Sequence, residues 1–346
     1  MRLEQDRQKF WPINCENNKG ENTIYKIKNP TTGQVIDSRE KIKECFGKFY
    51  QELYTQPPAA NEKSIDRFLS GLELPKIQDS QNEMLVKPIT IKEVNLAITK
   101  LKSGKSPGSD GYTGEWYKCL RANLTPLLLR TFNWVLQTGE IPPSWCEAII
   151  SLIPKENKDK QECGNYRPIS VLNVDYKLFT SILARRLENI LPEIINLDQT
   201  GFIHQRQTLD NIRKSLHIID HVTRQKTEAL IVGLDAEKAF DSVRWLFLYK
   251  VMDRFAFHGK FTRVIQSLYS KPTAQVKING DLSDSFQLER GSRQGCPISP
   301  LLFSLFIEPL GQWIRQSSQI KGVTMAGVEH KVAMFRRRCT SLHGGS

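Results

Sequence analysis

A short apolar run that ends abruptly on an acid is the feature that most constrains this chain. Leu230 to Leu234 is aliphatic and β-branched, which is typical of a buried strand, and Asp235 follows it directly. A carboxylate at the end of a strand held rigid by burial would reach a cleft, where a hard cation such as Mg²⁺ prefers oxygen ligands. An aspartate after a strand is also typical of a cap for the next helix, so Asp235 alone leaves both interpretations open.

The composition indicates a folded chain with a polyanionic partner. Of 346 residues, 39% are hydrophobic and 25% are charged, which excludes disorder as the main state. The net charge of +12 favours a partner such as nucleic acid. No apolar run is long enough to span a membrane, the N-terminus lacks the apolar core of a signal peptide, and the seven cysteines are scattered as reduced thiols would be. We therefore expect an intracellular protein of the cytoplasm, the nucleus or both.

Hydrophobic periodicity predicts the main helices and strands. Thr90 and Glu93 form a capping box at the start of one helix, and Arg185 and Arg186 lie off the apolar stripe of another, which predicts that they face solvent. Before residue 31 we expect an irregular arm. Further helices are expected over residues 37–54, 178–191 and 239–255 and after Pro300, strands over 148–153 and 230–234, a hairpin turning at 279–280 and a connector over 56–63.

A loop rich in glycine and proline covers residues 102–111. Its Gly104-Lys105-Ser106 resembles the end of a phosphate-binding Walker loop, but Thr99 stands where the first glycine of that motif belongs. A helix rather than a strand also precedes it, so we reject the Walker interpretation. A solvated turn and a loop that approaches a phosphate chain both remain open.

Five segments together carry a resemblance to a known family. In chain order they are residues 105–111 (KSPGSDG), 165–170 (NYRPIS), 198–202 (DQTGF), 234–241 (LDAEKAFD) and 290–300 (RGSRQGCPISP). The first three resemble finger segments, and the last two resemble successive palm motifs, of the reverse transcriptases of non-LTR, long-interspersed-element retrotransposons. The resemblance runs in order from Ile91 to Phe335. The last segment is also shared with intron-encoded and telomerase-like polymerases, although the finger segments favour the retrotransposon branch.

The resemblance implies a two-metal polymerase site. By resemblance, Asp235 binds two Mg²⁺ ions and Ala236 adds its backbone carbonyl. Phe240 lies under the sugar of the incoming deoxynucleoside triphosphate and excludes a 2′-hydroxyl. Lys155 and Arg167 hold the triphosphate, the lysine as a point charge and the arginine through its guanidinium fork.

Two further residues belong to the same implied pocket. By resemblance, Gln294 and Gly295 line the space for nucleotide and template, and glycine leaves room for the base pair. Taken one at a time, these residues have ordinary explanations as well. Phe240 suits a hydrophobic core, Arg167 a surface ion pair and Gln294 the closure of a loop.

The chain departs from the family after Phe335. Family members continue there into Ala-Asp-Asp, on a hairpin that supplies the remaining metal-binding carboxylates, whereas this sequence continues Arg336-Arg337-Arg338-Cys339. Positive charges would repel the cations, so we predict impaired Mg²⁺ binding and no polymerase activity. Without that hairpin, we also expect the strand 230–234 to have a bare apolar edge.

A frameshift by one base accounts for this tail. Codons for Ala-Asp-Asp-Val, read out of register, can encode Arg-Arg-Arg-Cys. The source nucleotide sequence after the Phe335 codon tests this hypothesis, and a splice product or a gene-model error are the alternatives.

We therefore expect an α+β chain that contains the fingers and an incomplete palm of a right-hand polymerase, with the thumb absent. Its expected partners are an RNA template, a DNA primer and deoxynucleoside triphosphates, with no membrane. The alternative is a non-catalytic remnant that binds RNA. The expected divisions are a linker-like arm with early finger helices over 1–90, fingers with the first palm elements over 91–225, the incomplete palm over 226–335 and the basic tail over 336–346.

Overall fold

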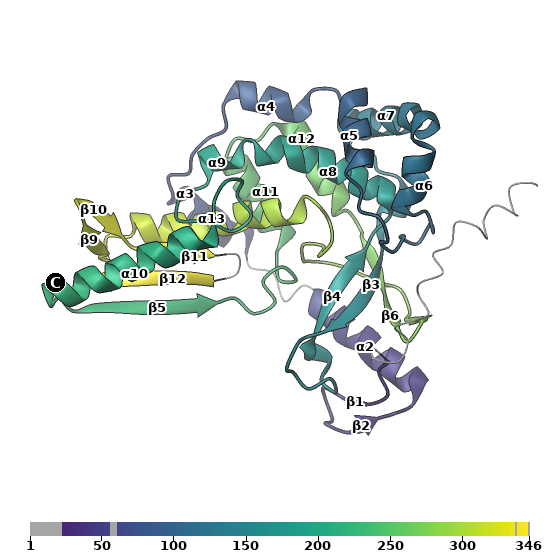
Figure 1. Ribbon diagram of the computed structural model, residues 1–346, viewed down its shortest axis with the longest axis horizontal. Helices are drawn as coiled ribbons and strands as arrows, with labels where there is room; N and C mark the ends of the chain where they lie inside the picture. The colour runs from purple at the N-terminus through teal and green to yellow at the C-terminus, as the bar shows by residue number, and fades with distance from the viewer. Residues whose placement is uncertain (1–22, 56–60, 336–337, 345–346) are drawn as a thin grey trace, which may run out of the picture.

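The computed structural model describes residues 23–55, 61–335 and 338–344, with Phe335 and 338–344 described by their backbone alone. It mixes helices and strands, which confirms the α+β class. Figure 1 shows two regions, one with most of the helices above a twisted sheet and one with a second sheet and two long helices. Among the described helices, none is both long enough and apolar enough to cross a lipid bilayer.

The first sheet has the strand order β4-β3-β6-β7, and β8 also pairs with β6. β3 is antiparallel to β4 and parallel to β6. A two-stranded sheet of β1 and β2 lies nearby (Figure 1). The strands are β1 (Ile27–Lys28), β2 (Val35–Ile36), β3 (Glu147–Pro154), β4 (Tyr166–Val171), β6 (Thr273–Ile278), β7 (Asp281–Leu282) and β8 (Phe286–Gln287).

Helices that share one large core pack against this sheet. Buried aromatic side chains fill the centre of the core, and Trp145, Phe132 and Phe179 contact one another there. The helices are α2 (Arg39–Tyr54), α3 (Glu62–Ser70), α4 (Asp79–Val86), α5 (Ile91–Thr99), α6 (Gly114–Cys119), α7 (Arg121–Thr138), α8 (Val174–Glu188), α9 (Leu191–Ile194), α11 (Trp245–Arg254) and α12 (Gly259–Leu268), with short 3-10 turns η2 (Pro143–Trp145) and η3 (Cys163–Asn165).

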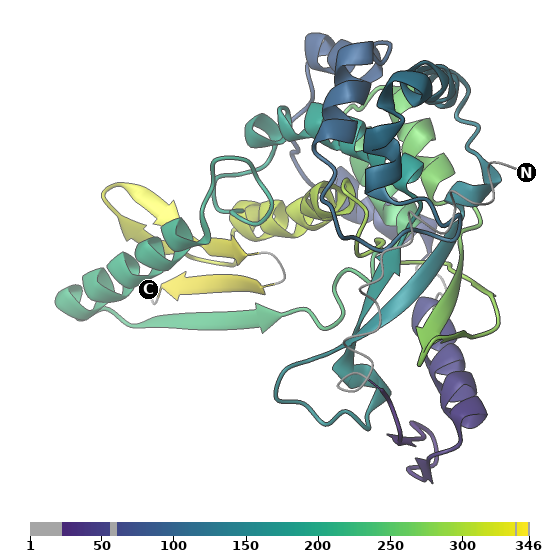
Figure 2. The ribbon, with the colours of Figure 1, turned by 45° about the vertical axis from the view of Figure 1, so that its right-hand side comes forward.

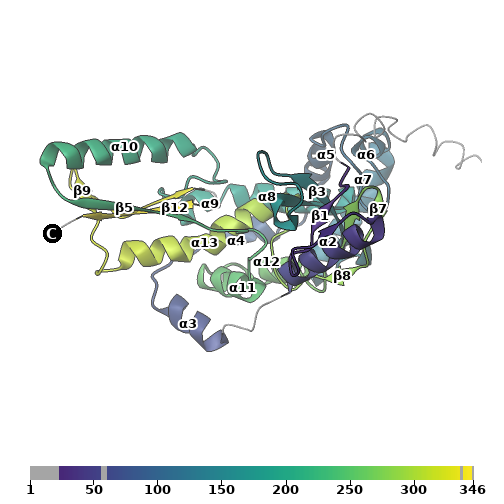
Figure 3. The ribbon, with the colours of Figure 1, turned by 90° about the horizontal axis from the view of Figure 1, so that it is seen from below.

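The second sheet has the order β11-β12-β5, and Figure 3 shows α10 and α13 on its opposite sides. Val332 and Met334 of β11 pack against Ile314 of α13. On the other side, α10 packs through Ile218 against a small hairpin of β9 and β10. These elements are α10 (Thr208–Gln225), β5 (Ala229–Asp235), α13 (Ser299–Gln316), β9 (Val323–Met325), β10 (Val328–His330), β11 (Val332–Phe335) and β12 (Arg338–Gly344).

Most elements with a clear local signal are confirmed. The helix predicted over 37–54 is α2, the strand over 148–153 is β3, and the hairpin turning at 279–280 joins β6 to β7. The capping box is also present, since the Thr90 hydroxyl accepts from the Glu93 backbone at 3.3 Å and Glu93 accepts from the Thr90 N–H at 2.9 Å. The predicted arm lies largely, and the connector partly, outside the described residues.

The predicted helix over 239–255 is wrong in its first part. The helix begins at Trp245, and the chain between Asp235 and Trp245 forms turns. Lys238 adopts a positive φ of 49°, and its carbonyl accepts from the N–H groups of Asp241 and Ser242. This local turn interrupts the helical pattern, because a left-handed residue cannot belong to a right-handed helix.

The expectation that the strand 230–234 has a bare edge is wrong for one of its two edges. The basic tail itself forms β12, which pairs with β5 along its length and sets Arg338 opposite Asp235. Main-chain pairing needs N–H and C=O groups rather than particular side chains, so this tail can form the hairpin. β5 is nevertheless the outer strand of the sheet (Figure 2).

Burial does not hold β5 in place, contrary to expectation. The exposed fractions of Leu230 and Leu234 are 61% and 50%, and Asp235 is exposed as well. The reason is the strand order, since β12 separates β5 from β11 and α13 packs on β11.

The prediction that Arg186 faces solvent is wrong, and its contacts explain why. Its guanidinium pairs with both carboxylate oxygens of Glu93, at 2.8 and 3.0 Å. It also donates to the carbonyls of Leu85, Lys87 and Pro88, which end α4 and lead into α5. Arginine has enough donors to satisfy all of these acceptors at once, and periodicity along one helix cannot reveal such partners.

We predict that Arg186→Met lowers the free energy of unfolding by about 3 kcal/mol, because it removes the cation that pairs with a half-buried carboxylate and the donors that three carbonyls accept from. Urea denaturation followed by circular dichroism measures the change. Arg185→Met, which changes the preceding residue of α8, is the matched control and should change stability by less than about 1 kcal/mol. Equal effects of the two substitutions would contradict this account.

Candidate active site

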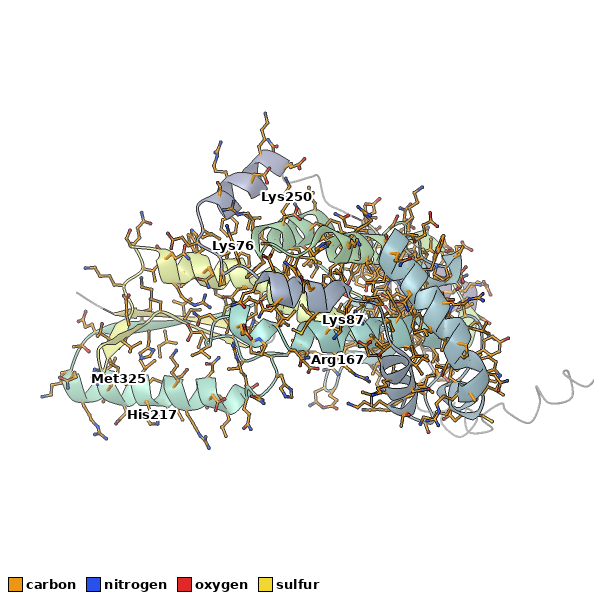
Figure 4. The ribbon with its side chains drawn as sticks, turned by 90° about the horizontal axis from the view of Figure 1, so that it is seen from above. Lys76, Lys87, Arg167, His217, Lys250 and Met325 are labelled. Carbon is orange, nitrogen blue, oxygen red and sulfur yellow. The ribbon has the colours of Figure 1, made fainter. Side chains whose placement is uncertain are left out.

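A cavity of about 560 Å³ lies where α2, the β3–β4 hairpin and the turn after β5 meet. Figure 4 shows Arg167, which lines it, near the middle of the molecule and away from the end where His217 and Met325 lie. Both charged and aromatic side chains line the cavity. The lining residues are Phe49, Tyr50, Leu53, Lys155, Gly164, Tyr166, Arg167, Pro168, Thr208, Asp235, Ala236, Glu237, Lys238, Asp241 and Gln294.

Most of the residues predicted for the site meet around this one cavity. Lys155, Arg167, Asp235, Ala236 and Gln294 all line it, although they come from three separate parts of the chain. Phe240 and Gly295 are not among the lining residues, and each lies next to one that is.

The β3–β4 hairpin positions the two cationic side chains. Lys155 follows β3, and its ammonium group donates to the Gly164 carbonyl at 2.8 Å. Arg167 lies on β4 opposite Ile153 and is exposed. In the part of the chain that the structure describes, the Arg167 side chain has no hydrogen bond or ion pair, so it does not act there as a surface ion-pair partner. Its fork of donors is available to an anion in the cavity.

The end of β5 and the turn after it contribute a third cation and three carboxylates to the cavity. The Lys238 ammonium lies 5.1 Å from the centre of the Phe49 ring, a cation–π contact that joins the turn to α2. Asp235 and Glu237 are exposed at the mouth of the turn, whereas Asp241 is only 4% exposed.

Asp241 is a polar residue of the cavity that reasoning from the sequence missed. Its carboxylate accepts from the Tyr54 hydroxyl at 2.9 Å and from the Gln294 amide at 3.2 and 3.3 Å. Burial, together with the charge of Asp241, raises the pKa of the Tyr54 phenol well above its ordinary value, so the phenol remains a donor. Asp241 ends one of the five quoted segments, but nothing in the sequence connects it with Tyr54.

Gly295 is required by the protein backbone itself. Its φ is +122°, and a Cβ atom there would lie 2.5 Å from the Ser170 carbonyl oxygen. The Ser170 N–H donates to the Gln294 carbonyl at 2.7 Å, so β4 and this loop are held closely together. The space that glycine leaves open is thus occupied by β4 of the same chain.

Phe240 packs in a small apolar cluster beside the cavity. Its ring stacks on Phe303 with centroids 4.5 Å apart and meets Phe202 edge to face at 5.8 Å. Ala239 and Val243 belong to the same cluster. The alternative of a core residue therefore describes its protein contacts, which hold the ring next to the turn that follows Asp235.

The described residues do not fit a two-ion magnesium site. A pair of Mg²⁺ ions needs several converging oxygen ligands. Among residues 23–55 and 61–334, no group of three or more His, Cys, Asp or Glu side chains is placed to hold a metal ion. Asp241, the buried carboxylate of the cavity, already accepts from Tyr54 and Gln294. Residues 335–346 contain no aspartate or glutamate.

Comparison with known proteins identifies the class. Residues 153–332, more than half of the chain, match the family model for reverse transcriptase (RNA-dependent DNA polymerase). The chain therefore belongs to the reverse transcriptase family.

Its relatives are proteins of transposable elements. The chain is 32% identical over 277 residues to an uncharacterized 149 kDa protein of transposon TX1 from Xenopus laevis, across 80% of this chain and 21% of that protein. It is 28% identical over 284 residues to the RNA-directed DNA polymerase from mobile element jockey of Drosophila melanogaster, across 81% and 30%. These findings confirm the resemblance to non-LTR retrotransposon reverse transcriptases. The chain spans less than a third of the length of these two relatives.

We predict that Gly295→Ala lowers the free energy of unfolding by about 2 kcal/mol, because the new Cβ meets the Ser170 carbonyl in a backbone conformation that disfavours side chains. Urea denaturation measures the change. Gly259→Ala is the control, since its added Cβ has open space, and should stay within about 0.5 kcal/mol of the parent. Unchanged stability of Gly295→Ala would mean that the loop and β4 separate easily.

Proposed function

We propose that this chain contains the fingers and part of the palm of a non-LTR reverse transcriptase, and that its cavity accepts a nucleoside triphosphate. The observation that carries the proposal is the meeting of Lys155, Arg167, Asp235, Ala236 and Gln294 around one space. Reverse transcriptases as a class bind a template and a primer and use divalent metal ions. In this family the bound ions stabilise the attacking and leaving oxygens of the transfer.

The proposed roles follow from the chemistry of each group. Lys155 and Arg167 bind the triphosphate, because an ammonium just after β3 and a guanidinium on the neighbouring β4 can reach the same anion. Asp235 and the Ala236 carbonyl offer oxygen atoms to a cation. Phe240, held by its aromatic cluster, supports the sugar, and Gln294 with Gly295 forms the neighbouring wall.

We further propose that the chain as it stands does not polymerise DNA. One exposed carboxylate at the end of β5 cannot position two cations, and the backbone position paired with it belongs to Arg338. Positive charge disfavours the binding of a cation, and residues 336–338 are all arginine. The chain is therefore proposed to keep the nucleotide cavity while lacking the ligands for the chemical step.

We predict no primer extension by the purified chain with an RNA template, a DNA primer, deoxynucleoside triphosphates and Mg²⁺. Gel analysis of the primer measures the product. DNA synthesis that Asp235→Asn abolishes would overturn the proposed inactivity, because that variant removes the remaining carboxylate without changing the size of the side chain.

The triple substitution R336A/R337D/R338D tests the same proposal by gain of binding. It places a carboxylate at the position paired with Asp235, so we expect Mn²⁺ affinity, measured by electron paramagnetic resonance, to rise at least tenfold. Adding Asp235→Asn to the triple variant should remove the gain. Equal Mn²⁺ affinity in the parent chain and the triple variant would contradict the role assigned to the missing carboxylates.

A second candidate function is RNA binding without catalysis. It is favoured by the net charge of +12 and by Lys100, Lys102 and Lys105, which are all exposed at and beyond the end of α5. We predict saturable RNA binding in a filter assay that weakens steeply between about 50 and 200 mM salt, because released counterions drive the association. Replacing the three lysines with alanine should reduce the steepness of the plot of log binding constant against log salt concentration by about 3. RNA binding that does not change with salt concentration would exclude this function.

A further inference from the structure

We propose that Asp241 is a positioning residue that fixes the side-chain amide of Gln294, so that the amide presents its carbonyl oxygen to the cavity. The inference rests on the proposed nucleotide-binding function, because it assigns the hydrogen-bonding polarity of one wall of that cavity. A nucleotide bound there would meet an acceptor, and it would need a hydroxyl or amino group as donor at this point.

The chemistry of the carboxylate determines the orientation of the amide. The Gln294 amide turns its NH₂ towards Asp241, and carboxylate oxygens that accept from this NH₂ favour that orientation over the reverse one. Both carboxylate oxygens lie within 3.3 Å of Nε2. The opposite end of the amide, Oε1, has no donor partner among the described side chains and backbone. Because Gln294 lines the cavity, this oxygen is available to a ligand.

Asp241 can impose this orientation because its own position is fixed. The Tyr54 hydroxyl donates to it, and Tyr54 is 6% exposed at the end of α2. The backbone N–H of Asp241 donates to the Lys238 carbonyl at 2.9 Å. A Cβ on Gly291 would lie 3.1 Å from the Tyr54 ring and 3.2 Å from the Asp241 carbonyl, so the loop passes close over both.

The loop that carries Gln294 is tied to the same groups. Arg290 donates to the Leu53 carbonyl at 2.9 Å, and the Glu289 N–H donates to the Tyr54 carbonyl at 3.1 Å. The Gln294 carbonyl accepts from β4, as described above. With its backbone held on both sides, Gln294 keeps its side-chain torsions, and the hydrogen bonds to both oxygens of Asp241 hold the amide at their end.

A second group of the same cavity has unused hydrogen-bonding capacity. The Tyr50 hydroxyl is buried and has no partner among the described residues, although Tyr50 lines the cavity. A buried hydroxyl without a partner costs free energy, so a bound molecule that pairs with it would gain affinity. An acceptor at Gln294 and a hydroxyl at Tyr50 therefore form a polar wall suited to a ligand that carries both donors and acceptors.

The test compares Asp241→Asn with the parent chain in two measurements. An asparagine can donate to Oε1, so the Gln294 amide can turn around and present NH₂ to the cavity. We expect dATP with Mg²⁺, measured by equilibrium dialysis, to bind about tenfold more weakly to this variant. In nitrogen-15 spectra of glutamine-labelled protein, the Gln294 NH₂ signal, assigned by its loss in Gln294→Glu, should also move.

A double variant distinguishes positioning from a merely structural role. In D241N/Q294E the asparagine NH₂ can donate to the new carboxylate, so the pair again directs an acceptor to the cavity. We expect this double variant to bind dATP more tightly than Q294E alone, in which two carboxylates repel each other. Failure of the double variant to improve on Q294E would overturn the proposal.

Control measurements separate this inference from the proposed function. Asp220→Asn changes an exposed aspartate of α10 that pairs with Arg224. It should leave both the dATP affinity and the Gln294 NH₂ signal unchanged. If the parent chain binds no dATP, the proposed nucleotide site fails, while the spectra still report on the amide. If the Gln294 signal does not move in Asp241→Asn, the positioning role fails whatever the chain binds.

Discussion

The cavity depends on one buried carboxylate that joins segments distant in the chain. Asp241 accepts hydrogen bonds from Tyr54 at the end of α2 and from Gln294 in the loop before α13. Burying a carboxylate costs free energy unless it is hydrogen bonded, so these partners must stay in place once the chain has folded. The wall of the cavity is therefore set by long-range polar contacts rather than by apolar packing alone.

The second sheet shows a different kind of constraint. Backbone pairing brings the tail after Phe335 alongside β5, although residues 335–346 contain no aspartate or glutamate. Pairing uses main-chain N–H and C=O groups, whereas the carboxylate ligands of a metal ion come from side chains. The strand order also leaves Leu230 and Leu234 exposed, so this sheet is less well buried than the one formed by β3, β4 and β6.

Local signals in the sequence predicted much of the fold. The capping box at Thr90 and the periodicity of residues 37–54 depend on neighbours a few positions away, and both are confirmed. The family resemblance also led to five of the residues that line the cavity, namely Lys155, Arg167, Asp235, Ala236 and Gln294. What the sequence did not reveal depends on distant partners. Arg186 is buried because acceptors from residues 85–93 surround it, and Tyr54 reaches Asp241 across 187 positions.

The contacts of α2 show how much of the chain is needed to enclose the cavity. The family match begins at residue 153, yet Phe49, Tyr50 and Leu53 form one wall of the cavity, and Tyr54 holds Asp241 from behind. A polypeptide trimmed to residues 153–332 would keep the five predicted residues that line the cavity but lose that wall. The part of the chain that encloses the cavity therefore begins upstream of the matched domain, and excising the domain alone would open the cavity to solvent.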